Sequence, residues 1–141
     1  MSIGVGVYDD AVGFYATSTW LAVPFTKERW DTSGFHSVAS NTSRLTVPAG
    51  QAGQYAIAGH FGWDNNNTGD RGIAIRLNGG DFIAVLMKKA KQGDTDALSI
   101  ATVYNLAVGD YVELMVEQES GGSLACETAG KWTQEFRMTL L

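Results

Sequence analysis

The stretch 29–37, RWDTSGFHS, gathers residue types that could do chemistry. It places Arg29, Trp30 and Asp31 close to His36, one of only two histidines in the chain. An imidazole that a carboxylate orients can bind a ligand or move a proton near neutral pH. The same residues also suit a loop at the edge of a β-sandwich, with Asp31 making a turn or pairing with Arg29, and Gly34 permitting the reversal. The residue types alone leave both interpretations open.

Metal-binding patterns are weak in this sequence. The sequence has no HExxH motif, no paired CxxC and no histidine-rich cluster, so a zinc site is unsupported. The stretch 64–70, DNNNTGD, is similar to the start of a calcium loop, but Ile75 stands where a bidentate glutamate is needed. A solvated hairpin loop explains the same residues. We therefore expect no metal and no cofactor, with Asp64 and Asp70 as weak candidates for a structural calcium ion.

The remaining reactive residues do not combine into a catalytic set, and we expect the protein not to be an enzyme. Cys126 has no histidine near it in the sequence, so a buried structural thiol is the expected role. In the stretch 53–63, His60 falls on the strand face opposite to the apolar residues, so it should be exposed or at an interface. Trp30, Trp63 and Trp132 could stack on sugars, although filling core ends or subunit contacts is the expected role.

Composition limits the classes of function. The 141 residues are 45% hydrophobic and 18% charged, which suits one folded domain with part of its surface facing other protein. A net charge of −5 with scattered basic residues argues against nucleic acid or an anionic membrane as partners. The N-terminus lacks the pattern of a signal peptide, so we expect a protein made in the cytoplasm and not secreted.

The residue pattern predicts an all-β fold. Strands are expected at 19–25, 43–47, 53–63, 71–80, 81–88, 97–106, 111–118 and 131–141. Gly-rich turns separate them, and no helical periodicity intervenes, which indicates an antiparallel sandwich or barrel. Residues 1–17 are only weakly periodic. They are expected to form an N-terminal arm, and residues 18–141 the folded domain.

The order of motifs resembles one family. FTKERWDTSGFHS, SRLTVPAGQAGQYAIAGHFGW, RGIAIRLNGG, LAVGDYVELMVEQ and a terminal FRMTLL are similar to the complement globular-head and tumour-necrosis-factor-like domain. The resemblance covers roughly residues 17–141. Its most specific parts are the VPAGQAGQYAIAGHF block and the spacing of Leu106, Gly109, Asp110, Val112 and Leu114.

The resemblance implies an antiparallel jelly-roll β-sandwich of about ten strands that forms a homotrimer around a threefold axis. It implies that Tyr55, Phe61, Tyr111 and Phe136 lie in the trimer seam or in the adjacent core. It also implies that the terminal strands pair, so that the 1–17 arm emerges at the base of the trimer. The stretch 29–37 becomes a covering strand and loop, with His36 at a sheet edge.

The lack of a collagen-like stalk, a membrane anchor and a secretion signal makes the chain more similar to stand-alone versions of this domain in tailed-bacteriophage virion proteins. This similarity implies a trimeric decoration or cement protein of the virion, with no catalytic role. Its partner would be the major capsid protein or another virion protein, contacted by the arm through Val5, Val7, Tyr8 and Phe14. The alternative is the tip of a head or tail fibre that recognises a glycan on the host surface.

Overall fold

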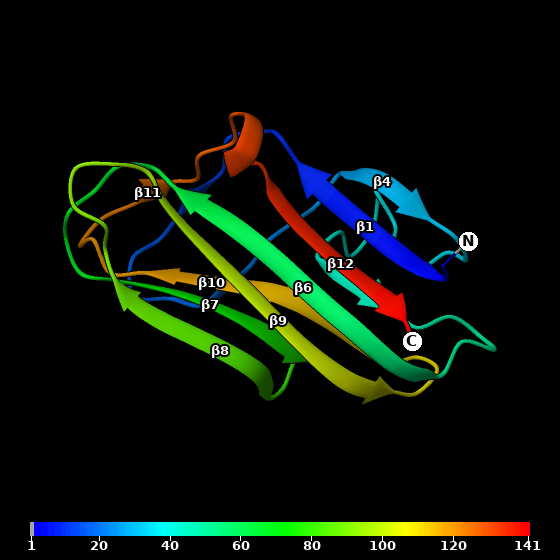
Figure 1. Ribbon diagram of the computed structural model, residues 1–141. Coiled ribbons are helices and arrows are strands. Elements are labelled where there is room, and N and C mark those ends of the chain that lie inside the picture. The colour runs from blue at the N-terminus through cyan, green and yellow to red at the C-terminus, as the bar shows by residue number, and fades with distance from the viewer. Residues whose placement is uncertain (1) are drawn as a thin grey trace.

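The computed structural model describes residues 2–141 and consists mainly of two β-sheets facing each other (Figure 1). The first sheet has five antiparallel strands in the order β4-β1-β12-β6-β9. Their bounds are Lys27–Asp31 (β4), Gly4–Asp9 (β1), Gln134–Leu140 (β12), Gly53–Trp63 (β6) and Asp96–Leu106 (β9). This sheet carries the surface developed below.

The second sheet has the order β3-β10-β7-β8, and a further strand, β5, also pairs with β10. Its strands are Leu21–Ala22 (β3), Tyr111–Gln118 (β10), Asp70–Leu77 (β7), Phe82–Lys89 (β8) and Arg44–Thr46 (β5). A small pair, β2 (Phe14–Tyr15) and β11 (Leu124–Ala125), closes one end of the sandwich, near the 3-10 turn η1 (Gly130–Trp132). The predicted all-β antiparallel jelly roll of about ten strands is confirmed.

The core lies between the two sheets and follows from the period-two pattern of their strands. In β6 the inward side chains are Tyr55, Ile57, Phe61 and Trp63, with Gly59 between them, and all five residues are buried. Successive strand residues point to opposite faces, so the residues between them point outward. Phe136 of β12 stacks on Phe25 with ring centroids 6.2 Å apart. Tyr55, Phe61 and Phe136 are therefore core residues of a single chain.

The hairpin between β7 and β8 forms where the Asn-Gly-Gly signal predicted it. Asn78 and Gly79 have positive φ angles of 52° and 67°. Two such residues in succession give the turn twist that matches paired strands. The Asn78 side chain donates to Asp110 at 2.9 Å, which ties this hairpin to the turn that precedes β10.

The expected N-terminal arm is wrong for most of residues 1–17. Strand β1 lies between β4 and β12, in the interior of the first sheet (Figure 1). Val5 and Val7 are in the hydrophobic core, where they cannot contact another protein. The alternation of glycine and valine in GVGVY is a period-two strand pattern with valines facing inward. Gly4, Gly6 and Tyr8 face outward, and Trp30 covers Gly6 so closely that a larger side chain at that position would collide with the indole.

Two strand boundaries also differ from expectation. The segment 19–25 is paired as a strand only at β3, and Pro24 follows two residues later. Residues 131–133 are a 3-10 turn and its cap, and β12 begins at Gln134. None of the described residues forms a helix with the length and hydrophobicity that a membrane crossing requires.

Candidate functional site

The outward side of the first sheet, called here the outer face, is made mainly of small residues. The strand register aligns Gly6, Ala58 and Ala101 in one row across β1, β6 and β9, with Arg137 of β12 between the first two. The next row aligns Ala56 with Val103. Trp30 covers Gly6, so the accessible part of these rows lies on β6 and β9. There the small side chains of Ala56, Ala58 and Ala101 leave the backbone close to the surface, so another molecule can approach closely.

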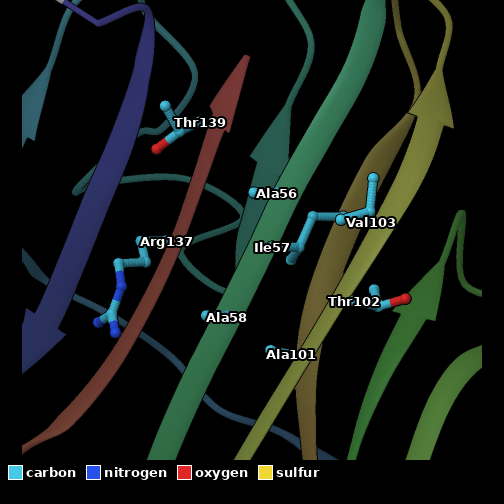
Figure 2. A pocket seen from close by; sticks show the side chains of 8 residues that line it. All are labelled: Ala56, Ile57, Ala58, Ala101, Thr102, Val103, Arg137 and Thr139. Atoms are coloured by element: carbon cyan, nitrogen blue, oxygen red, sulfur yellow. The ribbon is translucent and has the colours of Figure 1, made fainter. Parts of the chain in front are cut away.

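These rows form a shallow hollow of about 430 Å³ (Figure 2). Figure 2 shows Ala56 and Ala58 on β6 beside Ala101 and Val103 on β9, with the Arg137 side chain extending from β12 toward β1. The exposed area of its lining is largely apolar. A second hollow, which includes His60 and Ser99, continues along the same two strands. Together they make a continuous, weakly polar depression across the sheet.

A charged group lies on the outer face itself, in the register row next to the one that contains Arg137 and Ala58. Arg29 Nε donates to Glu135 Oε1 at 2.8 Å, and His60 Nε2 lies 3.5 Å from Glu135 Oε2. Burial raises the pKa of Glu135, but the hydrogen bond and charge of Arg29 outweigh it and lower this pKa overall. For His60, burial lowers the pKa against the opposing pull of Glu135, and the charges of Arg137 and Arg29 lower it further. The half-buried position of His60 on the outward face agrees with its predicted place.

A second apolar surface, called here the open edge, lies where β8 and β9 border the sandwich. Each of these strands pairs with one neighbour only. Val85 is more than half exposed, and Leu86, Met87 and Tyr104 are also exposed. Val103, which is exposed too, lines the hollow of the outer face and lies where the two surfaces meet. Long apolar edge strands readily pair or pack with another chain unless charge or a bulge protects them.

The opposite border of the sandwich is protected. There β4 carries the exposed charged residues Lys27, Glu28 and Arg29, and Lys27 pairs with Asp10 at 2.7 Å. In the other sheet the strands at this border, β3 and β5, have only two and three residues. Charge and short length are the usual means by which an edge avoids association. The two borders of the sandwich are therefore chemically different.

The 29–37 stretch consists of the end of β4 and the loop that follows it, and hydrogen bonds hold this loop in place, as one of its two interpretations predicted. Asp31 accepts backbone hydrogen bonds from Ser33, Gly34 and Phe35 at Oδ1 and from His36 at Oδ2. The His36 ring is fully buried, with Nδ1 2.8 Å from Glu28 and Nε2 2.9 Å from the Thr42 carbonyl. Both ring nitrogens are thus occupied in holding the loop, and neither is free to act on a ligand.

Tyr111 is the fourth residue that the resemblance assigned to the seam or the core, and it has a different position. It is half-buried at the start of β10, and Arg44 of β5 lies over its ring at 4.2 Å from the centroid. It therefore contributes to neither the inter-sheet core nor the outer face.

The acidic residues of the loop 64–70 are not arranged around a common centre. Asp64 accepts from the amide of Asn65 at 2.8 Å, and Asp70 forms an ion pair with Lys89 at 2.8 Å. The buried Arg71 guanidinium donates hydrogen bonds to the backbone carbonyl oxygens of Asn66, Thr68 and Asp70. The Arg71 cation therefore already binds these loop carbonyl oxygens. Within residues 2–141, no group of three or more His, Cys, Asp or Glu side chains is placed to hold a metal ion.

The other chemically reactive candidates are dispersed. Cys126 is buried, and burial raises the pKa of its thiol, which is the reverse of what a nucleophile needs. Burial also raises the pKa of Glu117, assisted by the neighbouring carboxylates of Glu119 and Asp70. These groups face no histidine and lie outside the two apolar surfaces.

The three tryptophans considered for sugar stacking have different positions. Trp63 is in the core against Tyr15, with ring centroids 5.5 Å apart. Trp30 lies over Gly6, so close that a Cβ on that glycine would be 2.7 Å from the indole nitrogen. Trp132 is half-buried beside Lys131. They therefore do not form one sugar-binding platform.

Phe14 is the most exposed of the four residues predicted to anchor the chain. It is 73% exposed on β2, and Val12 next to it is 59% exposed. Tyr8 is half-buried on the outer face, where Arg29 covers its ring at 4.3 Å. Val12 and Phe14 define an apolar tip at the end of the sandwich where β6 terminates.

Comparison with known proteins assigns the fold. No family model matches the chain, and no curated protein sequence matches it. Among solved structures, the globular domain of zebrafish complement 1qA matches with a TM-score of 0.70 and 14% identity, covering 99% of this chain and 97% of that one. Murine APRIL at pH 5.0 matches with a TM-score of 0.73 and 10% identity over 100% of both chains. Eiger TNF from S. frugiperda matches with a TM-score of 0.69 and 11% identity, over 99% and 92%.

The fold is therefore the jelly roll of complement globular heads and tumour-necrosis-factor-like proteins. Identities of 10–14% establish the architecture and leave the binding partners open.

Sequence reasoning did not identify the outer face or the open edge. Ala56, Ala58 and Ala101 carry no chemical signal, and they become a surface only when register aligns β6 with β9. One signal was available, because the outward positions in β6 are glutamine, alanine, histidine and glycine, with no charged acid or base, where a solvated strand normally has charged residues.

Proposed function

We propose that this protein is a non-catalytic assembly module that forms a homotrimer by packing the open edge of each chain against the outer face of the next. The single observation that supports this most is the pair of unlike apolar surfaces, one made of small residues and the other of larger exposed ones. The resemblance to complement globular heads and tumour-necrosis-factor-like domains implies a threefold assembly, which supports three copies.

The difference between the two surfaces argues for a ring. A twofold dimer brings one patch against its own copy, so it would pair two hollows or two protruding edges. An edge-to-face contact instead pairs Val85, Leu86 and Tyr104 with the shallow hollow around Ala58 and Ala101. In such a head-to-tail arrangement each chain packs its open edge on one neighbour and its outer face on the other. Every edge and every face is then covered only when the ring closes.

Burial supplies the driving force for this contact. Each apolar Å² removed from water contributes about 25 cal/mol, and stable interfaces bury about 800 Å² per partner. The edge strands β8 and β9 are 8 and 11 residues long, which gives them the length for a contact of this kind. The charged group around Glu135 lies beside the hollow, as expected for the polar rim of an interface.

Two charge-introducing variants test the proposal. Ala101→Arg adds a long cationic side chain to the row of the outer face that already holds Arg137, and Val85→Arg places a cation on the open edge. Both positions are exposed, so each variant should fold with the secondary structure of the wild type while sedimenting as a monomer. Ser33→Arg, at an exposed loop position away from both surfaces, is the matched control and should remain a trimer.

Mixing the two monomeric variants distinguishes edge-to-face from like-to-like contacts. Ala101→Arg retains an intact edge, and Val85→Arg retains an intact face, so together they should form one heterodimer. Neither variant alone should do so. Failure of the mixture to associate, or trimers in either variant alone, would contradict the edge-to-face arrangement.

We further propose that the trimer decorates a larger particle, of which a tailed-bacteriophage virion is the kind that the sequence resemblance implies. The apolar tip of Val12 and Phe14 supports this part of the proposal, since neither residue contributes to the sandwich core. A compact exposed apolar pair is typical of a contact with another protein. The tip replaces the arm residues Val5 and Val7 as the anchoring element.

The anchoring role is tested by the double variant Val12→Ser, Phe14→Ser. Both side chains are largely exposed, so the trimer should persist while co-sedimentation with assembled heads is lost. A double variant that retains full co-sedimentation would refute this anchor. The alternative of a glycan-binding fibre tip predicts that the chain binds host cells instead of heads.

A further inference from the structure

A polar pocket lies at the opposite end of the sandwich from the apolar tip. It has a volume of about 300 Å³ and is called here the loop pocket. Its wall consists of the loop that follows β4 together with β5, through Gly34, Phe35, His36, Ser37, Ser40, Asn41, Arg44 and Thr46. The pocket thus includes the second half of the RWDTSGFHS stretch, which the proposed assembly does not use.

The wall of the loop pocket is held rigidly from behind. Asp31 fixes four successive amides of the loop, and the buried His36 ring links Glu28 to the Thr42 carbonyl. The Ser37 hydroxyl oxygen accepts from the amides of Ala39 and Ser40, which leaves its proton free to donate. A preorganised wall loses little freedom when a ligand binds.

Arg44 is the one arginine or lysine in the lining of the pocket, and its guanidinium carbon lies 4.2 Å from the centroid of the Tyr111 ring. The ion pairs formed among residues 2–141 do not include it. Arg29 provides an internal comparison, because it lies over Tyr8 at 4.3 Å and its Nε binds the Glu135 carboxylate at 2.8 Å. At Arg44 the cross-strand neighbour Glu113 is already bound by Arg76 and Ser43, so this second arginine on a tyrosine has no carboxylate of the described residues within ion-pair distance.

We propose that the loop pocket binds an acidic sugar, with the carboxylate on Arg44 and the sugar hydroxyls on Ser37, Ser40 and Asn41. A planar guanidinium matches a carboxylate through two parallel hydrogen bonds. Hydroxyl and amide side chains suit a polyhydroxylated ligand better than an apolar one. The site belongs to a single chain and does not depend on the trimer.

The position of the pocket is compatible with the proposed assembly. Strand β5 pairs with β10 on the side away from β8, so the pocket lies at the border opposite to the open edge. A trimer would present three such pockets, and several weak sites on one particle gain strength by acting together.

The test is a titration of the full 15N-labelled chain with sodium glucuronate, glucose and sodium acetate, followed by amide chemical shifts. Glucuronate should shift the signals of residues 34–46 and the Arg44 Nε signal, glucose should leave them unchanged, and acetate should bind more weakly than glucuronate. Absence of shifts in this segment with about 20 mM glucuronate would overturn the proposal. Equal binding of acetate and glucuronate would overturn the sugar and leave a simple anion site.

Variants assign the binding to named groups. Arg44→Gln should weaken glucuronate binding by roughly tenfold or more, because it removes the charge-assisted bonds. Arg44→Lys should also weaken it, since a lysine keeps the charge and lacks the planar fork. Tyr111→Phe should bind as the wild type does, whereas Tyr111→Leu should bind less well.

Lys131→Gln is the matched control, as it removes one exposed cation elsewhere on the chain and should not change binding. Signals outside residues 34–46 and 111 report whether each variant keeps the fold. Glucuronate affinity in Arg44→Gln equal to that of the wild type would overturn the proposal.

Discussion

Replacing Asp31 with alanine should reduce the free energy of unfolding by about 3 kcal/mol. The carboxylate accepts four backbone amides, at 3.3, 2.9 and 3.0 Å for Oδ1 and 3.0 Å for Oδ2. The amides of Ser33 and Gly34 are exposed and can bind water in the variant. The amides of Phe35 and His36 are more sheltered, and a hydrogen bond to a charged group contributes about 1.5–3 kcal/mol.

Asp31→Asn is the informative partner of this variant. Its amide oxygen can keep the three bonds at the Oδ1 position, so only the bond from His36 at Oδ2 is lost, at a cost of about 1 kcal/mol. Urea unfolding followed by tryptophan fluorescence, at one fixed protein concentration because association adds to stability, gives both values. Equal stability of the two variants, or an alanine variant within about 0.5 kcal/mol of the wild type, would refute the role given to this carboxylate.

Two further predictions concern a glycine and a histidine. Gly69→Ala should destabilise the fold by about 2 kcal/mol or more, because φ is 74° and a Cβ would collide with the Glu119 carbonyl. The control Gly121→Ala has φ of 92° and open space around it, so it should cost about 1 kcal/mol; thermal unfolding compares them, and equal losses would contradict the collision. His60 has a lowered pKa in the fold, mainly through burial, although Glu135 opposes the shift and Arg137 and Arg29 reinforce it. The folded state therefore disfavours the protonated ring, and stability should fall as pH drops below about 6.5, where the unfolded histidine gains its proton. His60→Gln should lose less stability than the wild type between about pH 7.5 and 5.5. The same pH dependence in both proteins would show that His60 has no part in it.

The parts of the fold that the sequence predicted are those with strong local patterns. Alternation in 53–63 and the Asn-Gly turn at 78–79 specify β6 and the β7–β8 hairpin without reference to the rest of the chain. Strand β1 was missed because two of its three outward positions are glycine, and only the packing of Trp30 on Gly6 explains why glycine is needed at that position. Residue type and spacing contain no information on such a tertiary contact.

The candidate sites show the same limit. The turn made by Asp31 could be predicted, because aspartate commonly accepts amides from the residues that follow it. The outer face and the Arg44 pocket depend instead on which strands become neighbours. Arg44 and Tyr111 are 67 positions apart in the sequence, and the β5–β10 pairing brings them together.

The molar mass of the wild-type protein in solution tests the central proposal most directly. Multi-angle light scattering after size-exclusion chromatography, at micromolar concentrations, should give about three times the chain mass of 15.1 kDa. The mass should decline toward that of one chain in Ala101→Arg and in Val85→Arg. A monodisperse wild-type species at the mass of one or two chains would contradict the edge-to-face trimer.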